Sequence, residues 1–206
     1  LFRRGPLHTL RRDAPMYGGG KGRGGGKEGG ERQGEREAEQ GRELKQVADI
    51  CRKVNEWGRS MGMALTSCTV PAAGRPTFDL PDDEMEIGIG IHGEPGVERK
   101  NVAPADQIVD EMLEKILGDS VDFSGSEVAV MVNGMGGTPL MELYVAYAHV
   151  ADVLQREGVQ IWRMPYVGDY MTSLEMAGFS ITLLKLDDEM KPYLTAPCDV
   201  AAGRPF

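Results

Sequence analysis

Cysteine is scarce in this chain of 206 residues. The three that it has, Cys51, Cys68 and Cys198, lie far apart, and no Cys-x-x-Cys spacing occurs. We therefore expect neither a disulfide framework nor a cysteine-based metal site, but free thiols in a reducing, cytoplasmic compartment. Long apolar runs are also missing, since none approaches the ~20 residues of a membrane-spanning helix. The basic start of the chain, broken by Gly5 and Pro6, does not resemble a signal peptide, so we expect no membrane partner.

Positive charge is rare after residue 42. Residues 1–42 hold ten Lys/Arg and six Asp/Glu, a balance of +4, while the remaining 13 Lys/Arg and 26 Asp/Glu give a balance of −13, for a total of −9. Such an acidic surface repels phosphate backbones, so we expect no nucleic-acid binding by residues 43–206. The charge does not identify any other ligand.

The first 41 residues have little that could form a core. Residues 17–30 are almost entirely Gly, Lys and Arg, and glycine loses much conformational entropy on ordering. We interpret residues 1–41 as a disordered tail. An RNA-binding arm rich in Arg and Gly is an alternative, and a misread upstream segment is another.

From residue 42 onward, the hydrophobic pattern predicts a single α/β domain, 42–206, in which helices cover a mixed sheet. Apolar spacings of three and four predict helices at 43–61, 105–117 and 139–157, and a short helix at 172–177. Apolar or alternating runs predict strands at 84–92, 127–132, 159–164 and 179–186, and a strand or an extended segment at 64–70.

The predicted strand at 84–92 is the most informative part of the sequence. Its apolar residues alternate with Glu86, Gly88, Gly90 and His92. Period two would bury the apolar residues on one face and leave the glycines and His92 on the other. Glycine in a strand often marks the close approach of a ligand or of another backbone segment, so His92 is a candidate for ligand contact.

A histidine in this position has several possible roles. A structural role is the commoner one for a lone histidine, whereas a functional one could be that of a base, a nucleophile or a metal ligand. We expect no metal, because Glu94 is the nearest acid and His8 and His149 belong to unrelated segments. His149 falls inside a predicted helix, where it would be a packing or surface residue.

Two further loops are candidates for function. The run Gly134-Met135-Gly136-Gly137-Thr138 lies between a strand and a helix, where backbone N–H groups can bind an anion. It lacks the spacing of a dinucleotide or Walker motif, and a tight turn that lets helix and strand pack closely is the simpler interpretation. In the loop at 169–173, Thr172 or Ser173 would cap the predicted short helix.

Four stretches together resemble one known family. They are Ala64-Leu65-Thr66-Ser67-Cys68-Thr69-Val70-Pro71, Gly88-Ile89-Gly90-Ile91-His92-Gly93-Glu94-Pro95-Gly96, Val132-Asn133-Gly134-Met135-Gly136-Gly137-Thr138-Pro139-Leu140-Met141-Glu142-Leu143 and Thr172-Ser173-Leu174-Glu175-Met176-Ala177-Gly178-Phe179-Ser180. In order and spacing they resemble the C-terminal half of the substrate-binding K subunit of dihydroxyacetone (glycerone) kinase.

This resemblance implies a function for His92. In the family, the matching histidine bonds covalently to the ketone carbon of dihydroxyacetone, which is then phosphorylated to dihydroxyacetone phosphate. We expect Gly88, Gly90 and Gly93 to adjoin the substrate. The resemblance also implies a cytoplasmic homodimer that works with an L subunit or L domain, which would hold ATP or ADP with Mg²⁺. We expect no cofactor on this chain itself.

The resemblance covers only part of the family's K subunit. The family's N-terminal domain supplies a glycine-rich loop and a catalytic aspartate, and neither is found here. We therefore expect a truncated chain that is inactive alone, and its end soon after Pro197 favours the stand-alone, phosphotransferase-system type over the type fused to L. The alternative is a non-catalytic carbonyl-metabolite binder or regulatory protein derived from the K subunit.

Overall fold

The computed structural model describes residues 41–90 and 96–196. Its centre is a seven-stranded sheet in the order β3-β2-β1-β7-β4-β5, with β6 also paired to β4. The strands are β1 (Gly58–Ala64), β2 (Glu84–Ile87), β3 (Glu98–Asn101), β4 (Glu127–Gly134), β5 (Gln160–Ile161), β6 (Tyr166–Gly168) and β7 (Gly178–Lys185). β4 is parallel to β5 and β6, and the other pairs are antiparallel. The predicted mixed sheet is thus confirmed.

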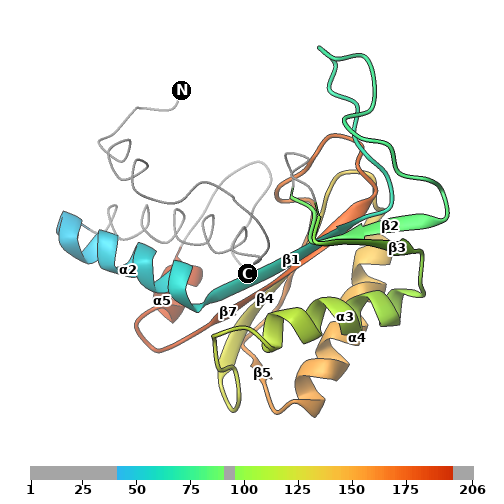
Figure 1. The fold of residues 1–206 in the computed structure, drawn as a ribbon. Helices are drawn as coiled ribbons and strands as arrows, with labels where there is room; N and C mark the ends of the chain where they lie inside the picture. Colours follow the sequence, from blue (N-terminus) through green and yellow to red (C-terminus); the bar gives the residue numbers. More distant parts are fainter. Residues whose placement is uncertain (1–40, 91–95, 197–206) are drawn as a thin grey trace.

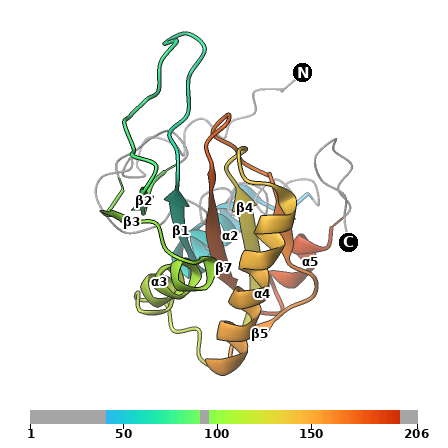
Figure 2. The same cartoon turned by 90° about the vertical axis from the view of Figure 1, so that its right-hand side faces the viewer.

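Helices cover both faces of this sheet (Figures 1 and 2). α3 (Ala105–Leu117) and α4 (Leu140–Arg156) pack on one face and enclose the main apolar core, which takes in Met63, Ile87 and Val132 from the strands. α2 (Leu44–Trp57) and the short α5 (Lys191–Leu194) build a second, smaller core around Val54 and Leu184 on the other face. None of the helices in these described ranges is long and apolar enough to cross a bilayer.

The predictions for α3 and α4 are confirmed to within a residue or two, but the one for α2 is too long. The helix ends at Trp57, and Gly58 adopts an extended conformation and begins β1. Met61, which continued the helical spacing, lies in β1 instead, because seven residue pairs with β7 hold this segment in the sheet. Of the strand or extended segment predicted at 64–70, only Ala64 belongs to a strand. After Ala64, residues 65–83 leave the sheet as a projecting arm that joins β1 to β2 (Figure 2).

The strand predicted at 84–92 is also shorter than expected. β2 ends at Ile87, because Gly88 has a φ of +85°, which breaks the extended conformation. The alternation of buried residues changes there too. Met85 and Ile87 face the main core, whereas Ile89 joins a separate cluster with Cys68 and Met135. The glycines therefore do not form one face of a continuous strand.

Two predictions in the C-terminal part of the chain need correction. The strand expected at 159–164 is reduced to the two residues of β5, and β6, which follows it along β4, lies beyond the predicted range. Arg163, with a φ of +59°, and Pro165, which has no N–H to donate, account for the interruption. The helix expected at 172–177 is a turn, in which Leu174 has a φ of +53°.

Candidate functional site

The segment with the predicted ligand histidine is the β2–β3 connection. His92 and Gly93 lie outside the described residues, but both ends of the connection are described. At its start, the Gly88 N–H donates a hydrogen bond to the Gly62 carbonyl at 2.6 Å. At its end, the Val97 N–H donates to the Ile87 carbonyl at 2.7 Å. The segment that carries His92 is thus tied to the sheet on both sides.

Gly88, which the sequence suggested as a substrate contact, is in close contact with the protein's own chain. A Cβ on Gly88 would lie 2.6 Å from Val97 Cγ2 and 3.0 Å from its backbone nitrogen. Together with the positive φ, this contact explains why glycine stands at the base of the connection. Gly90 is half-buried. That the two glycines adjoin a substrate stays a prediction.

The first residues of this connection lie against the end of β1. A Cβ on Gly62 would stand 2.6 Å from the Ile89 carbonyl oxygen, so only glycine lets the two backbones come this close. The Ile89 side chain is buried in a cluster with Ala64, Cys68, Met135 and Met176, against which Phe78 of the arm also packs. Residues 88–90 are therefore fixed over the sheet face that α3 and α4 do not cover.

The neighbouring part of that face carries small and hydroxylated residues. Ser60 and Thr182 are cross-strand partners, and their buried hydroxyl groups are 2.8 Å apart. One rung along the sheet, Gly62 lies opposite Ser180. This strip next to Ile89 has short side chains, in contrast to the opposite face, where the same two strands bury Met63, Ile181 and Leu183.

The glycine-rich loop after β4 packs against the turn at 172–177. A Cβ at Gly136 would collide with the Leu174 carbonyl, and one at Gly137 with the Glu175 carbonyl. The Met135 and Gly137 N–H groups donate to the carbonyls of Gly178 and Met176. These N–H groups are therefore used within the protein, which favours the tight-turn interpretation over an anion site.

Asn133 is a key residue of this end of the sheet that sequence reasoning missed. Its carboxamide oxygen accepts hydrogen bonds from the Tyr170 and Met171 N–H groups at 2.9 and 2.8 Å, and its nitrogen donates to the Met171 carbonyl at 2.8 Å. These three hydrogen bonds, which we call the Asn133 latch, fix the loop after β6. In that loop, the Asp169 carboxylate occupies the space that a side chain on Gly134 would need. Only the polarity of Asn133, in a strand that is otherwise apolar after Glu127, could have marked it.

The root of the arm is fixed to the same turn. The Thr69 N–H donates to Glu175 Oε1 at 2.6 Å, and the Leu65 N–H donates to the Ala177 carbonyl at 2.7 Å. Hydrogen bonds from its own N–H and from that of Thr69 hold the pKa of the Glu175 carboxyl below its usual value. Ser173 was predicted to cap a helix, but its hydroxyl instead donates to Cys68 Sγ at 3.3 Å.

No metal centre forms among residues 41–90 and 96–196, where no three His, Cys, Asp or Glu side chains converge. His149 lies on α4, and its Nε2 is 2.8 Å from Asp110 Oδ1 of α3. It is partly buried between the two helices, as the sequence interpretation expected.

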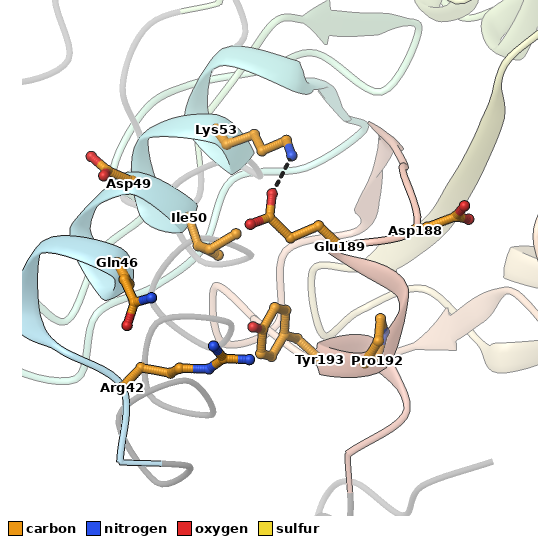
Figure 3. A pocket seen from close by; sticks show the side chains of 9 residues that line it. All are labelled: Arg42, Gln46, Asp49, Ile50, Lys53, Asp188, Glu189, Pro192 and Tyr193. Carbon is orange, nitrogen blue, oxygen red and sulfur yellow. Dashed lines mark hydrogen bonds and ion pairs between the residues drawn. The ribbon is translucent and has the colours of Figure 1, made fainter.

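A surface groove of about 390 Å³ lies at the opposite end of the sheet, between α2 and α5 (Figure 3). Arg42, Gln46 and Tyr193 contribute to its lining, and Lys53 forms ion pairs with Asp187 and Glu189 there. Because α2 ends where β1 begins, the full length of β1, about 20 Å, separates this groove from Ala64 and the arm. The groove is therefore not part of the candidate site.

Comparison with known proteins gives a consistent result. A family model described as the Dak1 domain matches residues 34–202. The chain is 44% identical over 160 residues to the dihydroxyacetone-binding subunit of a PTS-dependent dihydroxyacetone kinase from Listeria innocua, covering 78% of this chain and 48% of that protein. It is 43% identical over 187 residues to the dihydroxyacetone-binding subunit of the PEP-dependent kinase from Escherichia coli, covering 79% and 52%.

A similar fold is found among solved structures. The structure of a dihydroxyacetone kinase operon co-activator superposes with a TM-score of 0.72 at 30% identity, over 78% of this chain and 50% of that one. The fold is thus that of the Dak1 class. The chain belongs to the Dak1 domain family, and it spans about half the length of the curated relatives it matches.

Proposed function

We propose that this chain is the part of a dihydroxyacetone kinase substrate subunit that binds dihydroxyacetone covalently through His92. The observation that carries the proposal is the segment Ile91-His92-Gly93-Glu94-Pro95-Gly96, within a domain 44% identical to a dihydroxyacetone-binding subunit. The anchored ends of this segment support it, because a covalent anchor must stand at a fixed place relative to the phosphoryl donor.

The chemistry requires only an imidazole and a ketone. The unprotonated ring nitrogen of His92 attacks the carbonyl carbon, a C–N bond forms, and the π electrons move to the carbonyl oxygen. The other ring nitrogen loses its proton and the oxygen gains one, so the product is a neutral hemiaminal with no atom lost. Glycerol offers no carbonyl, and capture of this kind therefore selects ketones over polyols.

Phosphoryl transfer would follow at a hydroxyl group held in place by this anchor. We assign the nucleotide and Mg²⁺ to a separate L subunit or L domain. Among the described residues no carboxylate cluster could hold a metal, and the N–H groups of Met135 and Gly137 in the glycine-rich loop donate to carbonyl groups of the protein itself. In the proposal, the chain does not phosphorylate dihydroxyacetone alone. The same capture chemistry would accept erythrulose, the substrate in the names of related kinases that are 37% and 38% identical.

Intact-mass measurement under native conditions tests the anchor. The chain, alone and joined to the half of the Listeria subunit that it does not match, is incubated with dihydroxyacetone or glycerol. We expect the joined protein to gain the full mass of dihydroxyacetone, since a hemiaminal keeps the carbonyl oxygen, and the chain alone to gain it only weakly because part of the pocket is absent. His92→Ala should gain nothing, whereas the control His149→Ala should behave as the parent. Equal adduct in His92→Ala would refute the assignment.

A second function is favoured by one observation, the 30% identity to an operon co-activator. In that case the chain would bind a carbonyl metabolite without turnover, as a regulatory protein. Combining the joined protein with a nucleotide-bearing L subunit from a relative separates the two functions. Phosphorylation of dihydroxyacetone indicates the kinase component, and an adduct without turnover indicates the regulator. A genomic reading frame upstream that encodes the glycine-rich loop and aspartate would also favour the kinase.

A further inference from the structure

One buried carboxylate stands at the base of the β2–β3 connection. Glu86 lies in β2 and is only 9% exposed. Its side chain is on the sheet face opposite to that of Met85 and Ile87, which belong to the main core. A carboxylate so little exposed to water is costly unless each oxygen has a hydrogen-bond donor, so its partners indicate what it does.

Each oxygen of Glu86 has a different partner. Oε1 accepts the backbone N–H of Gly96 at 2.6 Å, and Oε2 accepts a hydrogen bond from Arg99 Nη2 of β3 at 3.2 Å. The Arg99 side chain is 44% exposed, so this ion pair is a weak anchor by itself. The bond to Gly96 is the shorter of the two, and it is made to the residue that closes the connection.

The fit between the two residues leaves no space. A Cβ on Gly96 would lie 2.5 Å from Glu86 Cγ and 2.6 Å from the Ile87 carbonyl oxygen. Gly96 is therefore held by the carboxylate from one side and by the β2 backbone from the other. Glu84, two residues earlier, approaches the same Arg99 at 3.9 Å, but no contact joins it to Gly96 among the described residues.

We propose that Glu86 is a positioning residue, which holds Gly96 and thereby one described end of the β2–β3 connection. This inference rests on the proposed function, in which His92 of that connection anchors the substrate. His92 is four residues from Gly96 and four from Gly88, so each held end is within about 14 Å of it along the chain. Glu86 does not touch the substrate in this proposal. It lowers the cost of ordering the histidine before the ketone arrives.

The test compares replacements that separate hydrogen bonding from packing. Glu86→Met keeps the side-chain volume but accepts no hydrogen bond, whereas the amide oxygen of Glu86→Gln still accepts from Gly96. Glu84→Met is the matched control, because it removes the other carboxylate near Arg99 and spares Gly96. Arg99→Met removes the contacts of Arg99 with Glu84 and Glu86 and leaves the bond from Gly96 to Glu86 in place. All are made in the full chain and in the protein joined to the Listeria half.

Two measurements are made on each variant, below its unfolding temperature. Amide hydrogen exchange at Gly96 and Val97 reports whether Glu86 holds Gly96, a contact that we call the clamp. The dihydroxyacetone concentration for half-maximal adduct reports whether that contact assists the reaction of His92. We expect Glu86→Met to raise both the exchange rate and that concentration about tenfold, the loss of one charge-assisted hydrogen bond. Glu86→Gln, Glu84→Met and Arg99→Met should each stay within about threefold of the parent.

The outcomes separate this inference from the function on which it rests. Faster exchange in Glu86→Met with unchanged adduct formation overturns the positioning role, as does a Glu84→Met defect equal to that of Glu86→Met. If Glu86→Met does not fold, Glu86→Gln tests the positioning role instead. A tenfold rise in the dihydroxyacetone concentration for half-maximal adduct in Glu86→Gln would contradict the role assigned to the oxygen that accepts from Gly96. A parent protein without adduct, in which exchange at Gly96 still depends on Glu86, overturns the proposed function and supports the clamp.

Discussion

The two ends of the sheet are held together in different ways. At the end where β1 and β4 terminate, backbone meets backbone, and Gly62, Gly136 and Gly178 stand where any side chain would collide with a carbonyl group. At the α2–α5 end, long side chains hold the elements together. Lys53 of α2 forms ion pairs with Asp187 and Glu189, which lie between β7 and α5. The first end bears the candidate site and the second bears the groove of Figure 3.

This difference has a physical meaning. Close backbone contacts leave no space for added atoms, which favours precise positioning of the residues that make them. Ion pairs between partly exposed side chains can adjust to a substitution, and each contributes little. We therefore expect changes at the glycine end to cost much more stability than changes at the α2–α5 end.

The largest effect is expected for Gly136→Ala. The new Cβ would collide with the Leu174 carbonyl, and the φ of +110° is unfavourable for alanine, so we expect a loss of about 3–5 kcal/mol in the free energy of unfolding. Gly158→Ala is the control, because its φ of +71° is also positive but nothing lies within 4 Å of its Cβ. It should cost about 1 kcal/mol. Equal losses in urea denaturation would show that the backbone contact is not what matters.

An intermediate effect is expected for Asn133→Ala. The substitution removes three hydrogen bonds and leaves the N–H groups of Tyr170 and Met171 without their acceptor, which should cost about 2–4 kcal/mol. Asn101→Ala, on the exposed edge strand β3, should change stability by less than about 0.5 kcal/mol. If the two variants unfolded at the same urea concentration, the latch would contribute nothing.

The smallest effect is expected at the α2–α5 end, and it depends on pH. Burial alone would raise the pKa of the Asp187 carboxyl, but hydrogen bonds from Lys53 and from the Met190 N–H outweigh it and hold that pKa below its ordinary value. A depressed carboxyl pKa stabilises the fold above its unfolded value of about 3.9, and this contribution is lost as pH falls through the folded pKa.

Asp187→Asn should therefore be less stable than the parent by no more than about 1 kcal/mol at pH 7. The difference should disappear as the pH falls well below about 3.9, where the parent carboxyl is protonated as well. Thermal unfolding of both proteins from pH 7 to about pH 2 measures this. A difference that grew at acid pH would mean that the sign assigned to the pKa of Asp187 is wrong.

Local patterns predicted α3 and α4 well because their boundaries are local. Pro104 and Gly118 limit α3, and Pro139 and Gly158 limit α4, so composition and periodicity agree there. β1 was missed because Met61 continues the apolar spacing of α2, and only pairing with β7, more than a hundred residues away, makes it a strand. Tertiary pairing overrode the local signal.

The site could be predicted only in part for the same reason. A short motif made His92 a candidate, which stays a prediction, and the glycines around it indicated close approach, which the structure explains at Gly88 by contact with Val97. The roles of Glu86 and Asn133 depend on partners 10 and 37–38 residues away in the chain. No local spacing encodes such contacts, so they required the folded chain.

The sheet margins have a consequence for association between copies of the chain. β3, at one margin, reads Glu-Arg-Lys-Asn, and three of its four residues are exposed. At the other margin, β5 and β6 have two and three residues and a gap between them. Charged or interrupted edges offer a poor template for another strand, so the open backbone at either margin is protected against edge-to-edge aggregation.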